Sequence, residues 1–507
     1  MHPSKTLIHR TSLSRRRRSG TRALLGRMPL LATWFGVGAA TLSAGCASTP
    51  SAHMHGGAAA PVAAQWNAPL PHGGQVSELS QWWAQFDDPL MLRLIEAGQQ
   101  ASPTLAEAAA RIGEARAARV SSRAALMPTL DASAGSSRAK QGPGGTTPVS
   151  PADLATAGLQ AGWELDLFGA VRAGANAARA RLVSSQARWH EARVSVAAEV
   201  AATYVELRAC EAQDRQAERD AASRARTSQL TSLAAKAGFQ ASAAADQASA
   251  SAAQGTVLLI RQRMQCDLLI KALTALTAQD EGALRGELLN RAGRLPQPAE
   301  FVVTAMPADV LAQRPDIFAA ELDVIAASAD SAQARARRWP RISLAGSIGT
   351  TRLGFEGTST TGSVWSFGPV TVTLPLLDGG ASRANAKAAH ARYEAVTVVY
   401  AARLRDALRE VESALVTLSS AAERTEAALI AARGFESSFG AAEAGYSAGI
   451  ASLFDLEDAR RSMVAAQVAL IELQRERVSA WIALYRALGG GWSSARVHDG
   501  PDEAPLR

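Results

Sequence analysis

The chain has 507 residues, of which 47% are hydrophobic and 5% aromatic, and its formal net charge is +7. This charge comes from the first 45 residues, which hold 8 lysines and arginines and no acid, so the remainder carries 45 basic against 46 acidic side chains. The net charge therefore gives no reason to expect a nucleic-acid-binding protein. Beyond residue 45 no run of 18 apolar residues occurs, so the sequence predicts no transmembrane helix there.

Residues 1–45 have the features of an export signal. Arg15–Arg18 belong to a basic n-region, an apolar h-region follows, and the motif LSAGC ends at Cys46. A small-small-Cys ending is typical of bacterial lipoproteins, in which the cysteine is acylated and becomes the first mature residue, although Ser43 stands where leucine is usual. We expect lipidation of Cys46 and a lipidated tether over residues 46–85. The alternative is an ordinary signal peptide in which Cys46 has no role.

The mature chain is a single duplication. The spacing between Pro103 and Pro128 is repeated by Pro315 and Pro340 in the second half of the chain. One duplication of such length is not a solenoid, whose repeats are a few tens of residues long. It indicates one unit of helices and short strands that was copied and fused. We expect two structural repeats, over 86–300 and 301–490, followed by a flexible tail over 491–507.

Each repeat contains long, alanine-rich helical stretches. In the second repeat, apolar residues keep a 4-3-4-3 spacing from Leu404 to Leu418, which is typical of coiled-coil packing. In the first repeat, no proline occurs between residues 176 and 237, a stretch that would form a helix of roughly 90 Å. We expect one helical hairpin in each repeat, over about 172–278 and 381–488.

Two β segments precede each helical hairpin. We expect β-hairpins over about 129–167 and 342–376, with the sequences QGPGGTTPVSP and GFEGTSTTG in their loops. Apolar residues such as Leu159 and Trp163 alternate with polar residues such as Gln160. This pattern is typical of a membrane β-barrel with lipid outside and water inside, although a half-buried soluble sheet shows it as well. Because four strands cannot close a barrel and an open edge is not tolerated in lipid, a membrane barrel would require several protomers.

Five ordered motifs within about residues 80–490 carry a resemblance to a known family. They are WWAQFDDPLMLRLIEAG, WELDLFGAVR, LAQRPDIFAAE, PLLDGGASRA and AGYSAGIASLFDLEDAR. Together with the duplication they resemble the TolC-type outer-membrane factors, in particular the NodT-like lipoprotein branch that partners resistance-nodulation-division (RND) efflux pumps. The resemblance implies a mainly α protein with a membrane β-barrel. It would be a homotrimer, with four strands per protomer in a 12-stranded outer-membrane barrel and a long α-helical barrel in the periplasm.

The resemblance also assigns roles near the two helical turns. Gly238 and Gly449 would lie at the periplasmic tip, where an adaptor protein docks. In the family an aspartate ring, an apolar ring one turn before it and a nearby arginine close the tunnel, and these places fall on Asp458, Phe454 and Arg461. The three residues share one helix face, so we expect them to form the periplasmic gate. A merely solvated ion pair between Asp458 and Arg461 is the alternative.

Two further cysteines lie at equal distances from the first turn. Cys210 precedes Gly238 by as many positions as separate Gly238 from Cys266. If Gly238 marks the turn of an antiparallel hairpin, the two sulfurs stand at the same height. The oxidising periplasm then favours a structural disulfide between them. Two buried free thiols are the alternative.

No phosphate-binding loop, nucleophile elbow or metalloprotease motif occurs, so we expect no enzyme, no metal site and no cofactor besides the lipid on Cys46. The predicted function is a passive exit duct in the outer membrane. It would conduct small molecules or drugs that a periplasmic adaptor and an inner-membrane RND transporter deliver. Two alternatives stay open: a conduit for type I protein secretion, and a periplasmic coiled-coil scaffold lipoprotein that forms no channel.

Overall fold

The computed structural model describes residues 79–140, 151–298, 313–355 and 357–492. The chain divides into two compact units, 1–57 and 58–507, and all described residues belong to the second. The predicted signal peptide and Cys46 therefore lie outside the described residues. Within the four described ranges, no helix combines the length and the apolar character that a membrane crossing requires.

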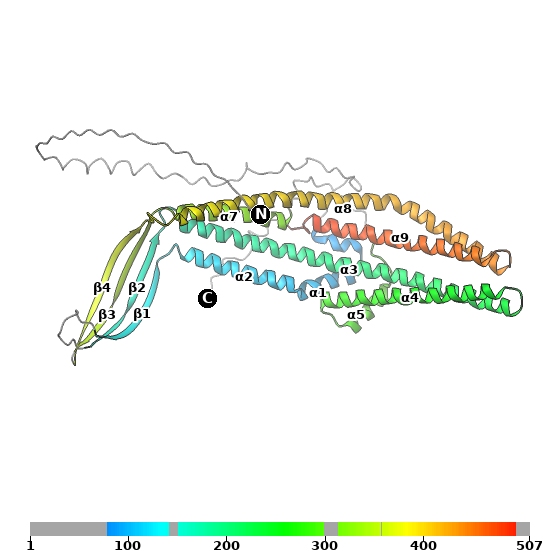
Figure 1. Cartoon of the computed structure of the whole chain (residues 1–507), viewed down its shortest axis with the longest axis horizontal. Coiled ribbons are helices and arrows are strands. Elements are labelled where there is room, and N and C mark those ends of the chain that lie inside the picture. The colour runs from blue at the N-terminus through cyan, green and yellow to red at the C-terminus, as the bar shows by residue number, and fades with distance from the viewer. Residues whose placement is uncertain (1–78, 141–150, 299–312, 356, 493–507) are drawn as a thin grey trace, which may run out of the picture. The chain divides into compact units, whose positions relative to one another are not determined.

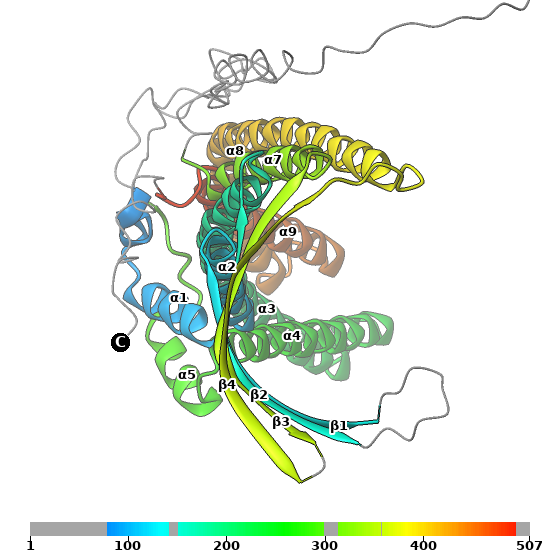
Figure 2. The same cartoon turned by 90° about the vertical axis from the view of Figure 1, so that its left-hand side faces the viewer.

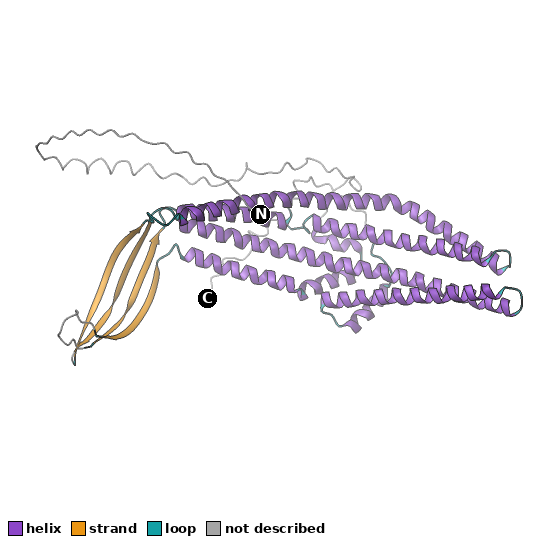
Figure 3. Cartoon of the chain, viewed as in Figure 1, coloured by secondary structure: helices purple, strands orange, loops and turns teal. Residues whose placement is uncertain are grey.

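The order of elements in the first repeat returns in the second. The first comprises η2 (Leu79–Phe86), α1 (Pro89–Ala101), α2 (Pro103–Ala124), β1 (Thr129–Ala139), β2 (Ala152–Leu165), α3 (Ala170–Lys236), α4 (Ser242–Thr277), α5 (Glu281–Leu288) and η3 (Leu289–Arg291). The second comprises α7 (Pro315–Ala336), β3 (Arg341–Phe355), β4 (Thr358–Thr373), α8 (Ala381–Ser447) and α9 (Leu453–Ala487). The strands gather at one end of the helices, and the helical hairpins α3–α4 and α8–α9 turn at the other (Figures 1 and 3).

Proline and glycine set the junctions between helices and strands. Pro128 and Pro340 each separate a helix from the strand that follows it, because proline removes a backbone donor and its ring clashes with the preceding turn. Where the strands lead back into the long helices, Gly169 and Gly380 have φ angles of 78° and 88°. Such left-handed backbone is readily adopted by glycine, so both junctions can turn sharply.

The sheet is antiparallel with the order β1-β2-β3-β4, so β2 and β3 pair across the two repeats. The register places Leu159 opposite Ile348, and Leu344 opposite Val370. Because side chains alternate along a strand, these apolar residues share one face, whereas Gln160 lies on the other. Figure 2 shows the sheet from its end as a curved layer. Along the half of the sheet next to the helices, the alternation in the sequence therefore corresponds to two faces of opposite polarity. Towards the hairpin loops it does not, because Leu154 and Leu353 pair on the face that holds Gln160.

The predicted loop that contains GFEGTSTTG is too long. β3 runs to Phe355 and β4 begins at Thr358, and these two residues pair with each other. Gly357 has a φ of 82°, which suits the tight connection of a two-residue hairpin. The serine and threonine residues after it therefore belong to β4 instead of forming a loop.

The packed body extends beyond the predicted limits at both ends. Trp82 is buried and its ring centroid lies 5.9 Å from that of Trp481 on α9. The tether predicted over 46–85 therefore includes residues that belong to the core. Trp492 is buried as well, so the tail predicted over 491–507 begins too early. In both places large aromatic side chains gain more from burial than the chain loses by becoming ordered.

Candidate functional site

The two helical hairpins turn at the predicted glycines. Gly238 and Gly449 have φ angles of 80° and 75°. The N–H of the residue after each glycine donates to the carbonyl five residues back, at 2.8 Å in the first hairpin and 2.9 Å in the second. This is the Schellman arrangement, which satisfies carbonyls that would otherwise lack a partner at a helix end. Both turns lie far from the sheet (Figure 1).

The residues directly after these glycines are exposed apolar side chains. Phe239 is 84% exposed and Ile450 is 87% exposed. They occupy equivalent places in the sequences KAGF and SAGI. Sequence reasoning did not single them out, although an apolar residue after both turn glycines was a signal for a contact surface.

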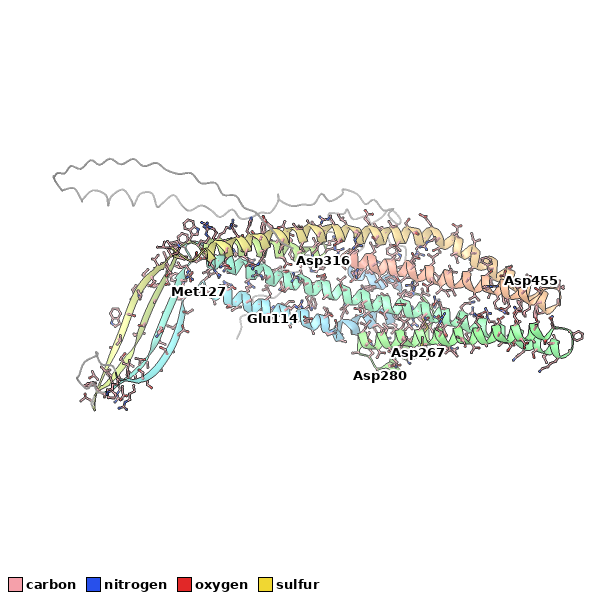
Figure 4. All side chains as sticks on the ribbon, viewed as in Figure 1. Glu114, Met127, Asp267, Asp280, Asp316 and Asp455 are labelled. Atoms are coloured by element: carbon pink, nitrogen blue, oxygen red, sulfur yellow. A yellow bond between two sulfur atoms is a disulfide. The ribbon has the colours of Figure 1, made fainter. Side chains whose placement is uncertain are left out.

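The predicted gate residues lie on the first turns of α9. Ser452 caps this helix: its hydroxyl accepts from the N–H of Asp455 at 3.1 Å, and hydrogen bonds from Ser452 lower the pKa of the Asp455 carboxyl. Figure 4 labels Asp455 close to this turn. Phe454 is 68% exposed, and Arg461 pairs with Asp458 at 3.1 Å, with both side chains exposed. The described chain thus presents the apolar, acidic and basic groups together on solvent-exposed helix turns.

A buried network of charges lies beside these gate residues. We call it the tip network. It consists of Asp220, Ser223, Arg224 and Thr227 on α3, Ser251 on α4, and Glu457 and Arg460 on α9. The Arg460 side chain has no exposed surface. Sequence reasoning missed the network, because the α3 residues and the α9 residues are far apart in the chain.

Arg460 is the centre of the tip network. It forms an ion pair with Glu457, and its Nη2 donates to the hydroxyls of Thr227 at 2.9 Å and Ser223 at 3.2 Å. Its guanidinium carbon also lies 5.5 Å from the ring centroid of Phe439 on α8. A buried charge is tolerated only when it is paired and hydrogen-bonded. These contacts therefore hold α9 at a defined position against α3.

Arg224 extends the network to α4. Its Nη1 donates to Ser251 at 2.7 Å and to Glu457 at 3.1 Å, and its Nε donates to Asp220 at 2.8 Å. Gly255 leaves room for this side chain, since a Cβ at that position would lie 2.8 Å from the Arg224 Cδ and would displace it. The network thus couples the hairpin of the first repeat to that of the second.

Cys210 and Cys266 form a disulfide that joins α3 to α4, with 5.6 Å between their Cα atoms. Both residues belong to the main apolar core of the described chain. The predicted placement at equal height thus corresponds to a covalent link in the structure. It restrains the first hairpin at the level of the core, well away from the turn at Gly238.

The described residues offer no metal centre, since none of their groups of three or more His, Cys, Asp or Glu could hold an ion. What they present instead is paired long helices, a tip with exposed polar and apolar groups, and a sheet with one apolar and one polar face. This combination defines the class of duplicated, channel-forming envelope proteins.

Comparison with known proteins identifies the family within that class. Residues 94–279 and 306–490 match the model of the outer membrane efflux protein family. Outer membrane protein OprJ of Pseudomonas aeruginosa is 31% identical over 478 residues, which cover 92% of this chain and 98% of OprJ. The chain therefore belongs to the outer membrane efflux protein family, and it is an outer-membrane efflux protein. The resemblance based on the five motifs is confirmed.

Two further proteins support the assignment to this family. The solvent efflux pump outer membrane protein SrpC of Pseudomonas putida is 29% identical over 457 residues, covering 86% of this chain and 94% of SrpC. The solved structure of the outer-membrane channel OprN superposes with a TM-score of 0.77 at 26% identity, covering 86% of this chain and 98% of OprN. The family and these relatives are transport proteins.

Proposed function

We propose that three copies of this chain form a passive exit duct of a tripartite efflux system. Each protomer would contribute its four strands to a 12-stranded barrel in the outer membrane and its long helices to a periplasmic tunnel. The observation that carries the proposal is the half of the sheet next to the helices, whose apolar face suits lipid and whose polar face suits a water-filled lumen. Among the described strands, β1 and β4 each have one edge without a partner, and neighbouring protomers would pair with these edges.

The gate would be formed by Phe454, Asp458 and Arg461. Three-fold symmetry turns each residue into a ring, and three aspartates at one level repel one another unless they are solvated or paired. The Asp458–Arg461 pair supplies the compensating charge. The tip network holds α9 against α3 through Arg460. The rings would therefore open only when α9 moves relative to α3.

The partners would meet the duct from the periplasmic side. The exposed side chains of Phe239 and Ile450 support docking of a periplasmic adaptor at the turns. That adaptor would connect the duct to an inner-membrane RND transporter. Acylation of Cys46 would add a lipid anchor at the N-terminus. No cofactor besides this lipid is part of the proposal.

The cargo would be small molecules rather than proteins. SrpC is named as part of a solvent efflux pump, and its sequence covers most of this chain. This supports small-molecule efflux over type I protein secretion. Membership of an outer-membrane efflux family likewise argues against a scaffold lipoprotein that forms no channel.

The test is planar-bilayer conductance of the detergent-extracted protein, with its oligomeric mass measured alongside. We expect a trimer that inserts and gives small, voltage-sensitive current steps. A monomer that never conducts would contradict the proposal and favour the scaffold.

The gate is tested by the double substitution Phe454→Ala with Asp458→Ala. Removal of the apolar and acidic rings should raise single-channel conductance several-fold, because the narrowest part of the tunnel widens. Asp406→Ala is a matched control, since Asp406 forms another exposed pair with an arginine three residues later on α8. Unchanged conductance in the double variant would contradict the gate assignment but not the proposed duct.

A further inference from the structure

A polar cavity lies between the last turns of α7 and the first turns of α8, close to the helix–sheet junction. Its volume is about 470 Å³. Three alanines contribute apolar surface, and the polar lining consists of Asp330, Gln333, Arg337, Ser382, Asn385 and Arg392. The size falls in the range of pockets that hold small organic molecules. Neither the gate nor the tip turns use any of these residues.

The charge in the cavity is positive. Asp330, its only acidic lining residue, is already paired with Arg181 of α3. Among the described residues, no ion pair joins Arg337 or Arg392 to a carboxylate. The contrast with the tip network is clear, because there each arginine bonds to a carboxylate.

The surrounding sequence strengthens this positive charge. Residues 331–341 and 379–393 contain no aspartate or glutamate, and three acids stand directly beside these segments, namely Asp330, Asp378 and Glu394. The same two segments hold seven basic residues, which are Arg335, Arg337, Arg338, Arg341, Arg383, Lys387 and Arg392. The basic residues thus outnumber the acids, and a surface of net positive charge raises the local concentration of anions. The junction is therefore a region that attracts anions.

We propose that this cavity binds the carboxylate or phosphate group of a small organic anion. Planar guanidinium groups such as those of Arg337 and Arg392 suit these groups, since they donate parallel hydrogen bonds to two oxygens. The amides of Gln333 and Asn385 and the hydroxyl of Ser382 supply further polar contacts. The inference rests on the proposed exit duct and names a substrate class for it: organic anions that pause at the junction before they leave.

We expect the cavity to bind an anion weakly. Arg337 and Arg392 are exposed, so water competes for their donors and salt screens their charge. A conduit also has to release its cargo, because conduction requires sites that do not retain what enters them. We therefore expect dissociation constants of roughly 1 mM, a value that corresponds to about 4 kcal/mol of binding free energy.

The test uses phenyl phosphate, benzoate and the neutral benzamide as probes, with binding to the detergent-purified full-length protein measured by ligand-detected NMR. Wild type should bind both anions and not benzamide, and added salt should weaken binding. The variant Arg337→Gln with Arg392→Gln should lose at least tenfold in affinity. The matched control is Arg335→Gln with Arg383→Gln, which removes two exposed arginines of the same helices that do not line the cavity.

Equal anion binding by wild type and the Arg337/Arg392 variant, or equal binding of benzamide and benzoate, would overturn the proposal. An equal loss in the control variant would also overturn it, since a diffuse basic surface would then suffice. Bilayer recordings of the same samples separate the two proposals. Channels that conduct normally without anion binding would support the duct and contradict the anion site. Anion binding without channels would support the site but contradict the duct, and with it the substrate class.

Discussion

The two helical hairpins have almost the same dimensions but differ in how they are held together. α3 and α8 both have 67 residues, and α4 and α9 have 36 and 35. In the first hairpin, Cys210 and Cys266 stand at equal distances before and after the turn glycine and form a disulfide. In the second hairpin, the corresponding positions are Ala421 and Arg477. The duplication thus preserved the fold and not the covalent restraint.

Near that height the second hairpin also packs into the apolar core, through Leu418 and Val478, but its described residues form an ion pair where the first hairpin has a disulfide. Arg424 of α8 pairs with Glu476 of α9 at 2.7 Å, and both side chains are largely exposed. A surface pair of this kind contributes about 0–1 kcal/mol, whereas a disulfide typically contributes about 2–4 kcal/mol. The hairpin with the weaker restraint is also the one that carries the proposed gate. We therefore expect α8–α9 to move, and α3–α4 to act as the fixed part.

The largest effect should follow from removing the centre of the tip network. Arg460→Ala removes one of the two arginines that pair with Glu457 and leaves Arg224 as the other, so the cost should be at most the roughly 3–5 kcal/mol of a fully broken buried pair. Hydrogen exchange in the first turns of α9 should therefore increase by orders of magnitude. Arg461→Ala is the control, because Arg461 is exposed and should have little effect. Similar exchange in both variants would show that the network does not hold α9.

Removal of the native disulfide tests whether α3–α4 is the more strongly restrained hairpin. Cys210→Ser with Cys266→Ser should lower the free energy of unfolding by about 2–4 kcal/mol, because the unfolded chain regains the freedom of a closed loop. Denaturant unfolding of the variant and of reduced wild type provides the measurement. A tryptic map without reductant that shows both cysteine peptides free would contradict the premise.

A disulfide introduced between α8 and α9 should restrain the second hairpin as the native disulfide restrains the first. Ala421→Cys with Arg477→Cys places cysteines at the matching positions of the second hairpin. If they bond, we expect a stabilisation below about 2–4 kcal/mol, since engineered disulfides often deliver less than native ones. Channel opening should decrease under oxidising conditions and recover with reductant. The single variant Ala421→Cys is the control, and unimpaired opening of the oxidised double variant would refute a moving second hairpin.

The smallest expected effect is the change in Tm on substitution of Glu191, which lies on α3 away from the hairpin turns. Burial, and then the charge of Asp316, raises the pKa of the Glu191 carboxyl. Its ionisation therefore destabilises the fold at neutral pH, and this penalty disappears as the pH falls towards the ordinary carboxyl pKa, where the group is protonated in both states. Glu191→Gln should raise the Tm by about 1 °C at pH 7.5 and leave it unchanged at pH 4. A gain that is the same at both pH values would exclude the titration as its cause.

Features that depend on neighbouring residues or on regular spacing could be predicted from the sequence. Pro128 and Pro340 ended helices, and Gly238 and Gly449 formed turns, because the backbone conformation of these residue types is restricted or unusually free. The spacing of the cysteines around Gly238 then needed only hairpin geometry. The segment after Gly357 was misjudged, since glycine, serine and threonine occur in loops and in the polar face of a strand alike.

The sequence by itself thus determined the duplication, the helical hairpins, the alternating strands and the family. Only the tertiary structure decided which distant segments meet. It paired β2 with β3 across the repeats and brought Arg460 to Thr227, 233 residues away. It also brought Arg337 and Arg392 to the lining of one cavity. The physical reason is that backbone preferences act over a few residues, whereas burial of a charge or closure of a cavity depends on partners that only the folded chain brings together.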